Sequence, residues 1–106
     1  MARALINVPP TAKKGEVIEI KTMIAHVMET GYRIGVTGAP IPRDIIDRFV
    51  CTYNGDVVFE AQLFPAIAAN PFISFFTVAT ESGIFAFSWT DQHGKTQVET
   101  AKISVE

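Results

Sequence analysis

Apolar residues recur at every second position in the runs 49–53 and 57–63. A period of two residues is typical of a β-strand that buries one face. The two runs are separated by Asn54 and Gly55, and these residue types adopt the positive φ of a two-residue hairpin turn at little steric cost. The pattern therefore predicts a β-hairpin with its turn at this pair.

The segment 17–24 has the same period: one side carries Ile18, Ile20, Thr22 and Ile24, and the other carries Val17, Glu19, Lys21 and Met23. Its β-branched content favours a half-buried strand over a helix. Further strands are predicted, from alternation or β-propensity, at 3–8, 72–79, 84–90 and 95–105.

The predicted strand at 72–79 is apolar on both faces. Its faces carry Phe72, Phe76 and Val78 on one side and Ile73, Phe75 and Ala79 on the other. A two-layer sandwich covers only the inner face of each strand. The second apolar face therefore predicts contact with another chain.

The longest irregular segment is 28–43, which contains three glycines and two prolines. We expect it to be a crossover between the two sheets of a sandwich, with a short strand at 32–36 as a further option. Pro42 suits the first position of a helix, so a helical turn at 43–47 is an alternative to an extended chain there. Long loops in compact domains also often carry function.

About seven short strands spaced 8–12 residues apart are typical of an immunoglobulin-like β-sandwich. We therefore predict an all-β sandwich, as a single domain over 1–106, because 106 residues hold one core. The cysteine pair of antibody domains is absent, since Cys51 is the only cysteine. The prediction thus concerns the architecture and not the antibody family.

The composition raises the question of what covers the apolar residues. They make up 48% of the chain, only 19% of residues are charged, and the mean hydropathy is +0.25. Either some apolar residues are scattered over the surface, which is normal, or one face is covered by another chain. We favour the second explanation.

Charge and hydropathy patterns argue against several classes of partner. The net charge of −2 and the lack of a basic cluster argue against nucleic-acid binding. The uncharged run 61–80 contains Pro65 and Pro71, so it is not a membrane span. The amino-terminal residues lack the pattern of an export signal.

The residues predict no catalytic apparatus, cofactor site or metal site. His26 and His93 are the only histidines, and no recognised metal-ligand spacing is present. Cys51 lies between Phe49 and Tyr53 on an apolar face. A buried thiol is therefore favoured over a nucleophile or a mixed-disulfide partner.

Four short motifs carry a family resemblance, and together with their flanking residues they cover 12–95 most clearly. They are METG, FxCxYNG, AANP and FxWxDxxG. In this combination the chain resembles the SoxZ family, the smaller subunits of the SoxYZ carrier complex of bacterial thiosulfate oxidation.

The resemblance implies an immunoglobulin-like sandwich that forms a heterodimer with a SoxY-type chain, whose terminal cysteine arm carries the sulfur intermediates. It implies a subunit that is not an enzyme and that helps to present the carrier through transient contacts with other Sox enzymes. It also implies a periplasmic location, with export bound to a signal-bearing SoxY. This chain ends in AKISVE, without a terminal cysteine, so Cys51 is not assigned the carrier role.

The predicted partner interface consists of Val58, Phe64, Phe72 and Phe75. For each residue the alternative is a place in the core, because the sequence does not decide which face of a strand points inward. Two other functional hypotheses are a self-associating sandwich that binds a small ligand through its loops and a small redox protein using Cys51. We expect the isolated chain to self-associate, as a symmetric dimer.

Overall fold

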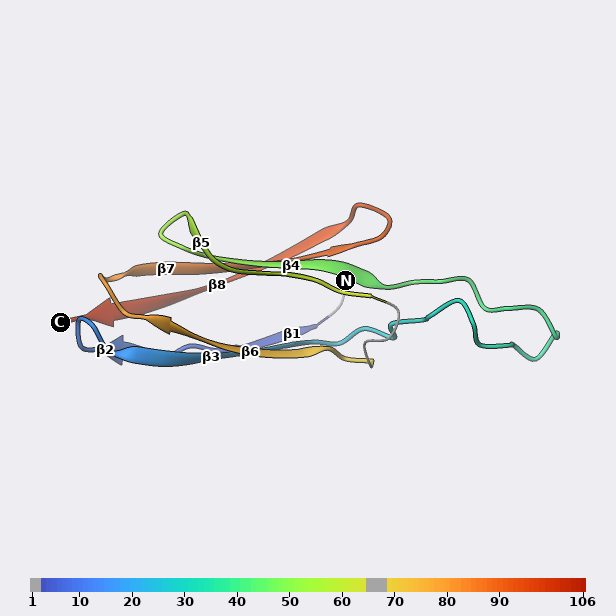
Figure 1. The fold of residues 1–106 in the computed structure, drawn as a ribbon, viewed down its shortest axis with the longest axis horizontal. Coiled ribbons are helices and arrows are strands. Elements are labelled where there is room, and N and C mark those ends of the chain that lie inside the picture. The colour runs from blue at the N-terminus through green and yellow to red at the C-terminus, as the bar shows by residue number, and fades with distance from the viewer. Residues whose placement is uncertain (1–2, 65–68) are drawn as a thin grey trace.

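Two β-sheets lie face to face in the computed structural model, which describes residues 3–64 and 69–106 (Figure 1). The described residues form eight strands and no helix. One sheet has the order β1-β3-β6 and the other the order β2-β8-β7-β4-β5. The strands are β1 (Ala4–Asn7), β2 (Thr11–Ala12), β3 (Val17–Ile24), β4 (Ile46–Tyr53), β5 (Asp56–Gln62), β6 (Phe72–Val78), β7 (Gly83–Asp91) and β8 (Thr96–Val105).

The predicted all-β, immunoglobulin-like sandwich is confirmed, with one more strand than expected. The additional strand is β2, which is not among the strands predicted from the sequence. It pairs in parallel with the end of β8, Thr11 opposite Ser104 and Ala12 opposite Val105. Two residues are too short for a periodic pattern, so only the tertiary pairing shows this strand.

The core lies between the two sheets and is mainly aromatic on the five-stranded side. The alternation in β3 is confirmed, because its inward positions are all buried. The buried hydroxyl of Thr22 donates a hydrogen bond of 3.0 Å to the carbonyl oxygen of Ile73. Burial of each large apolar side chain contributes about 1.5–3 kcal/mol. The largest fully buried side chains are Trp89, Phe49, Phe85, Phe87, Ile20 and Ile24.

The hairpin prediction is confirmed at the β4–β5 turn. Asn54 and Gly55 have φ values of 50° and 88°, the positive values that a type I′ turn requires. The Asn54 side chain also accepts a hydrogen bond of 2.9 Å from the N–H of Ile84. Because Asn54 lies against Gly83, a Cβ at Gly83 would meet its side-chain oxygen at 1.8 Å.

The hydroxyl group of Tyr53 ties this hairpin to the connection between β6 and β7. It accepts hydrogen bonds from the N–H groups of Thr80, at 3.3 Å, and Glu81, at 3.1 Å. It donates a third to the carbonyl oxygen of Glu81. One side chain thus provides partners for three backbone groups in a short connection.

We predict that Tyr53→Phe lowers the free energy of unfolding by about 1–3 kcal/mol, because these backbone groups lose their partner while the ring stays buried. Urea denaturation measures the change. Tyr32→Phe is the matched control. Tyr32 is 83% exposed, so loss of its hydroxyl group is expected to leave the free energy of unfolding unchanged. Equal midpoints for the two variants would show that the hydroxyl of Tyr53 is not structural.

Candidate partner interface

The outer face of the three-stranded sheet is apolar and exposed. Phe72 and Phe76 on β6 are 62% and 67% exposed, and Val17 on β3 is 62% exposed. Leu5 on β1 and Val78 on β6 are exposed as well. The second apolar face predicted for the strand at 72–79 is therefore present, and within the described chain it is open to solvent.

Cross-strand pairing groups these side chains into rows. Leu5 pairs with Met23, and Met23 pairs with Phe72, so one row crosses the whole sheet. Val17 pairs with Val78 at the other end of β6. The first row borders a shallow hollow that also reaches Lys21, Thr22, Ile6 and Asn7. A partner surface would thus meet an apolar sheet with one depression, rather than a flat polar face.

The four predicted interface residues lie in different places. Phe72 belongs to the outer face just described. Phe64 is 61% exposed but borders a different hollow, beside Arg43 and Arg48. Val58 is partly buried against the core and borders a groove between β5 and the end of β6. The structure does not bring these three side chains onto one surface.

Phe75 is a core residue within this chain. It is 6% exposed, and its ring stacks on Phe59 at a centroid distance of 4.5 Å. The stated alternative, ordinary core, therefore describes Phe75. Its neighbour Phe76 points outward instead, because successive residues of a strand face opposite sides of the sheet.

The interface prediction left out Leu5, Val17, Phe76 and Val78. The sequence did indicate Phe76 and Val78, because the period of two places both on the same strand face as Phe72. For Leu5 and Val17 the pattern carried no such signal, because they join the patch only through the strand order β1-β3-β6.

The connection between β3 and β4 is a long arm that projects beyond both sheets (Figure 1). It crosses from the three-stranded to the five-stranded sheet, as expected, and makes the molecule 58 Å long but only 20 × 19 Å in section. Its two limbs pair through backbone bonds between Glu29 and Asp44, and Ile34 forms an isolated bridge with Pro40. The optional strand at 32–36 is reduced to that bridge.

The helical turn considered at 43–47 is wrong. The backbone of Asp44 exchanges hydrogen bonds of 2.8 and 2.9 Å with Glu29, and β4 begins at Ile46. Pairing across the arm therefore holds this segment extended, and Pro42 starts no helix.

Charge on the arm is concentrated near its base. Arg33 Nε lies 3.2 Å from both carboxylate oxygens of Glu29. Through this hydrogen bond, and then through its charge, Arg33 lowers the pKa of Glu29. Beyond Arg33 the arm carries only uncharged residues as far as Pro42, and Ile34 and Val36 are exposed.

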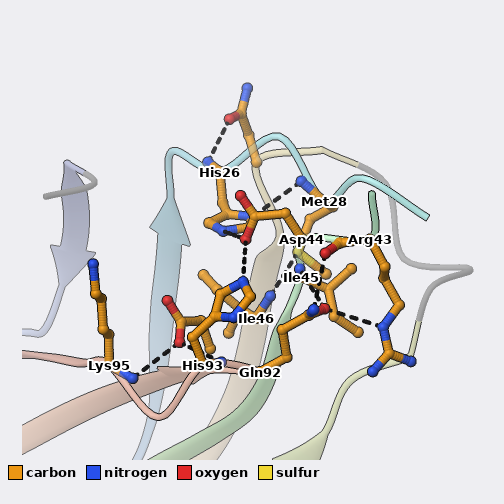
Figure 2. A network of polar contacts seen from close by, with 11 residues as sticks. His26, Met28, Arg43, Asp44, Ile45, Ile46, Gln92, His93 and Lys95 are labelled. Atoms are coloured by element: carbon orange, nitrogen blue, oxygen red, sulfur yellow. Dashed lines mark hydrogen bonds and ion pairs between the residues drawn. The ribbon is translucent and has the colours of Figure 1, made fainter. Parts of the chain in front are cut away.

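A polar network holds the base of the arm against the β7–β8 turn (Figure 2). Gln92 accepts hydrogen bonds from Arg43 Nε, at 3.1 Å, and from the N–H of Ile45, at 3.2 Å. Its amide nitrogen donates to the carbonyl oxygen of Arg43 at 2.8 Å. One glutamine side chain thus fixes the point where the arm returns to the sandwich.

Two histidines from opposite sheets meet one carboxylate in this network. Nε2 of His26 and Nε2 of His93 lie 3.7 and 3.8 Å from Oδ1 of Asp44. His26 Nδ1 accepts a hydrogen bond from the N–H of Met28, so a neutral His26 carries its proton on Nε2. Among residues 3–64 and 69–106, no group of three or more ligand side chains is arranged to hold a metal ion.

Cys51 is buried in the core, with no exposed surface. Desolvation by burial raises the pKa of its thiol to about 12. A thiolate is the reactive form of cysteine, and an apolar core disfavours it. This environment weighs against the redox hypothesis.

In the part of the chain that the structure describes, no helix is long and apolar enough to cross a membrane.

Comparison with known protein families identifies the family to which the chain belongs. Residues 6–102 match the family described as Sulphur oxidation protein SoxZ. The chain belongs to the SoxZ family. It is thereby a subunit of a Sox sulphur-oxidation system, and the resemblance carried by the four sequence motifs is confirmed.

Solved structures of similar shape include superoxide reductases and a sulfur carrier protein. Superoxide reductase (neelaredoxin) from Ignicoccus hospitalis superposes with a TM-score of 0.75 at 13% identity, covering 99% of this chain and 82% of that one. The sulfur carrier protein SoxY from Chlorobium limicola f thiosulfatophilum gives a TM-score of 0.67 at 11% identity, covering 97% and 78%. At such identities the likeness shows a shared fold. A search of curated proteins gave no significant match.

Three of the four motifs that carried the family resemblance contribute residues at the base of the arm. METG contributes Met28, with a φ of 49°, and AANP contributes Asn70, whose Oδ1 accepts a hydrogen bond of 2.9 Å from the N–H of His26. FxWxDxxG contributes Asp91, whose Oδ1 accepts from the N–H groups of His93 and Lys95, both at 2.9 Å. These motif residues therefore hold the turns and connections around the base of the arm.

We predict that the native Cys51 thiol reacts with a thiol reagent at pH 8 at a small fraction of the rate seen in denaturant. With a pKa of about 12, only about one thiol in ten thousand is ionised at that pH. A colorimetric thiol assay with and without urea measures the ratio. Native labelling as fast as denatured labelling would revive the redox hypothesis.

We predict that the isolated chain self-associates through the outer face of the three-stranded sheet, because exposed apolar patches of this kind promote association. Sedimentation velocity over a concentration series measures the effect. Phe76→Asp is expected to yield a monomer. Val98→Asp is the control, because Val98 is 57% exposed on β8 of the other sheet. A monodisperse monomer for the unmodified chain at high concentration would contradict the prediction.

Proposed function

We propose that this chain is the non-catalytic partner subunit of a SoxYZ-type sulfur carrier complex. In this complex it binds a SoxY-type chain through the outer face of the three-stranded sheet. The observation that carries the proposal is the outward apolar face of β6, Phe72, Phe76 and Val78, in a chain of the SoxZ family. Its role is to support the chain that carries the sulfur intermediates.

The energetics of this face support a permanent partner. Each half-exposed Phe, Leu or Val side chain has about 1 kcal/mol still to gain from complete burial. Five such side chains lie on three adjacent strands, and the paired charges of Glu19 and Lys21, 3.7 Å apart, lie between the apolar rows. A partner that covers the sheet removes this apolar area from water, and Glu19 and Lys21 enter the contact as an ion pair.

The one thiol of the chain supports a non-catalytic role. A sulfur carrier needs an accessible, ionisable cysteine, whereas burial raises the pKa of Cys51 to about 12. The carrier thiol in this proposal therefore comes from the partner. The sandwich provides a rigid base that holds the partner in place.

We assign to the arm the transient contacts of the complex with other Sox enzymes. It projects from one end of the sandwich and ends in uncharged residues, so it stays accessible when the sheet face is covered (Figure 1). The proposal includes a periplasmic location, which the family resemblance supports.

We predict that this chain and a tagged SoxY-type chain elute together in a 1:1 ratio after co-expression. Phe72→Asp and Phe76→Asp are each expected to weaken the complex by about tenfold or more, because a charge is then buried in an apolar contact. Calorimetry or quantitative pull-down measures the loss.

Val98→Asp serves as the matched control and is expected to bind like the unmodified chain. If the SoxY-type chain is folded and monodisperse but this chain does not elute with it, the partner role is refuted. If Val98→Asp weakens the complex and Phe76→Asp does not, the partner occupies the five-stranded sheet instead.

A further inference from the structure

The strand β6 forms one border of the three-stranded sheet. In the order β1-β3-β6 it pairs with β3 on one side, and none of the described strands pairs with its other side. A groove separates the Val78 end of β6 from β5, which is an edge strand of the other sheet. Within the described chain, β6 is therefore a free edge, as are β1, β2 and β5.

Every second residue of β6 directs its backbone N–H and C=O groups away from β3. Just beyond the strand, the N–H of Ala79 donates a hydrogen bond of 2.8 Å to the carbonyl oxygen of Glu16. In an antiparallel pair, hydrogen-bonded positions alternate with positions whose backbone groups point outward. The unbroken register therefore gives β6 four outward residues, which are Phe72, Ser74, Phe76 and Val78.

β6 has none of the features that protect an edge strand from pairing with another chain. Natural sheets protect their edges with charged side chains, prolines, bulges or very short strands. The sequence of β6 is FISFFTV, which contains no charged residue and no proline, and all seven residues pair with β3 without a register shift. An edge of this length and regularity is a template for a further strand.

The other three edge strands are each protected. β1 has four residues and β2 has only two. β5 carries Asp56 and Glu60, and its register with β4 skips Val58, which is a β-bulge. A bulge bends the strand and increases its twist, so a flat partner strand no longer matches it. The lack of protection is thus specific to β6.

The free edge of β6 adjoins the apolar outer face of its sheet. Phe72, Phe76 and Val78 provide exposed side chains on that face and outward backbone groups at the edge. A partner that covers these side chains up to the border also removes water from the backbone groups beside them. Each backbone group that is buried without a hydrogen-bond partner costs about 1–3 kcal/mol, whereas an added strand supplies the hydrogen bonds.

We propose that the partner chain adds one of its own strands to the free edge of β6, so that the three-stranded sheet continues into the partner; this rests on the partner role proposed above. The solved SoxY structure shares the sandwich fold, and open sheets of such a fold end in edge strands that can pair. The segment that fits is extended, about as long as the seven residues of β6, free of proline, and apolar at every second position.

Ser74 offers a matched pair of variants. Its N–H points to the free edge, and its exposed hydroxyl donates a hydrogen bond of 3.0 Å to Glu19. Ser74→Pro removes the N–H and places a ring at the edge, where proline is tolerated because the bonds to β3 do not use this position. Ser74→Ala also lacks the hydroxyl but keeps the N–H.

We expect Ser74→Pro to weaken the complex with a tagged SoxY-type chain by about tenfold or more, because a backbone hydrogen bond is lost and the added strand is displaced. Ser74→Ala is expected to bind like the unmodified chain. Calorimetry measures both affinities.

Amide hydrogen exchange in the unmodified chain is the second measurement, and it stays valid even where Ser74→Pro fails to fold. In the isolated chain, we expect the four outward residues of β6 to exchange fast and the three residues between them to exchange slowly. In the complex, we expect all seven to exchange slowly. Contacts between backbone protons of the two chains, measured in isotope-filtered NMR spectra, identify the added strand.

Three results would overturn this inference. The first is a complex in which the outward amides of β6 still exchange fast or Ser74→Pro binds as tightly as Ser74→Ala. The partner then covers only the sheet face, and its proposed role stands. The second is slow exchange of these amides in the isolated chain that depends on its concentration and is unchanged by the partner, which shows that a second copy occupies the edge. The third is the absence of any complex with a folded, monodisperse SoxY-type chain, which refutes the partner role as well.

Discussion

The packing of two inner sheet faces against each other is the interaction on which the rest of this structure depends. Phe49 on β4 and Trp89 on β7 pack at a ring-centroid distance of 5.3 Å, and the alternating residues of β3 close over the aromatic layer. Because a strand presents successive residues to opposite sides, each inward choice determines the outward neighbour. Burial of Phe75 therefore exposes Phe76, and the apolar outer face of β6 follows from the core itself.

The two ends of the sandwich differ in how their polar groups are satisfied. At the β4–β5 turn, the side chains of Tyr53 and Asn54 accept hydrogen bonds from backbone N–H groups between the end of β6 and the start of β7. At the opposite end the arm leaves the sandwich, Gln92 anchors its return, and Trp89 and Gln97 keep unpaired atoms. Side chains thus fix the connections at both ends of the sandwich: Tyr53 and Asn54 at one end and Gln92 at the other.

The shared fold of superoxide reductase and SoxY structures illustrates that a sandwich does not specify a function. Three features separate this chain from a generic sandwich: a family match over residues 6–102, a buried thiol, and an apolar sheet face. Three of the four motifs that carried the resemblance contribute residues at the base of the arm. Met28 has a positive φ there, and Asn70 and Asp91 accept backbone hydrogen bonds.

The sequence by itself determined the hairpin turn, the two-sided character of the strand at 72–79 and every strand except β2. These features are local, since a period of two and an Asn-Gly pair impose their geometry on adjacent residues. Only the tertiary structure decided that Phe75 is core and Phe76 surface, that Leu5 and Val17 join the apolar face, and that Trp89 meets Gln97. Those outcomes depend on strand order and on which side of each sheet meets the other, and both are contacts between residues far apart in the chain.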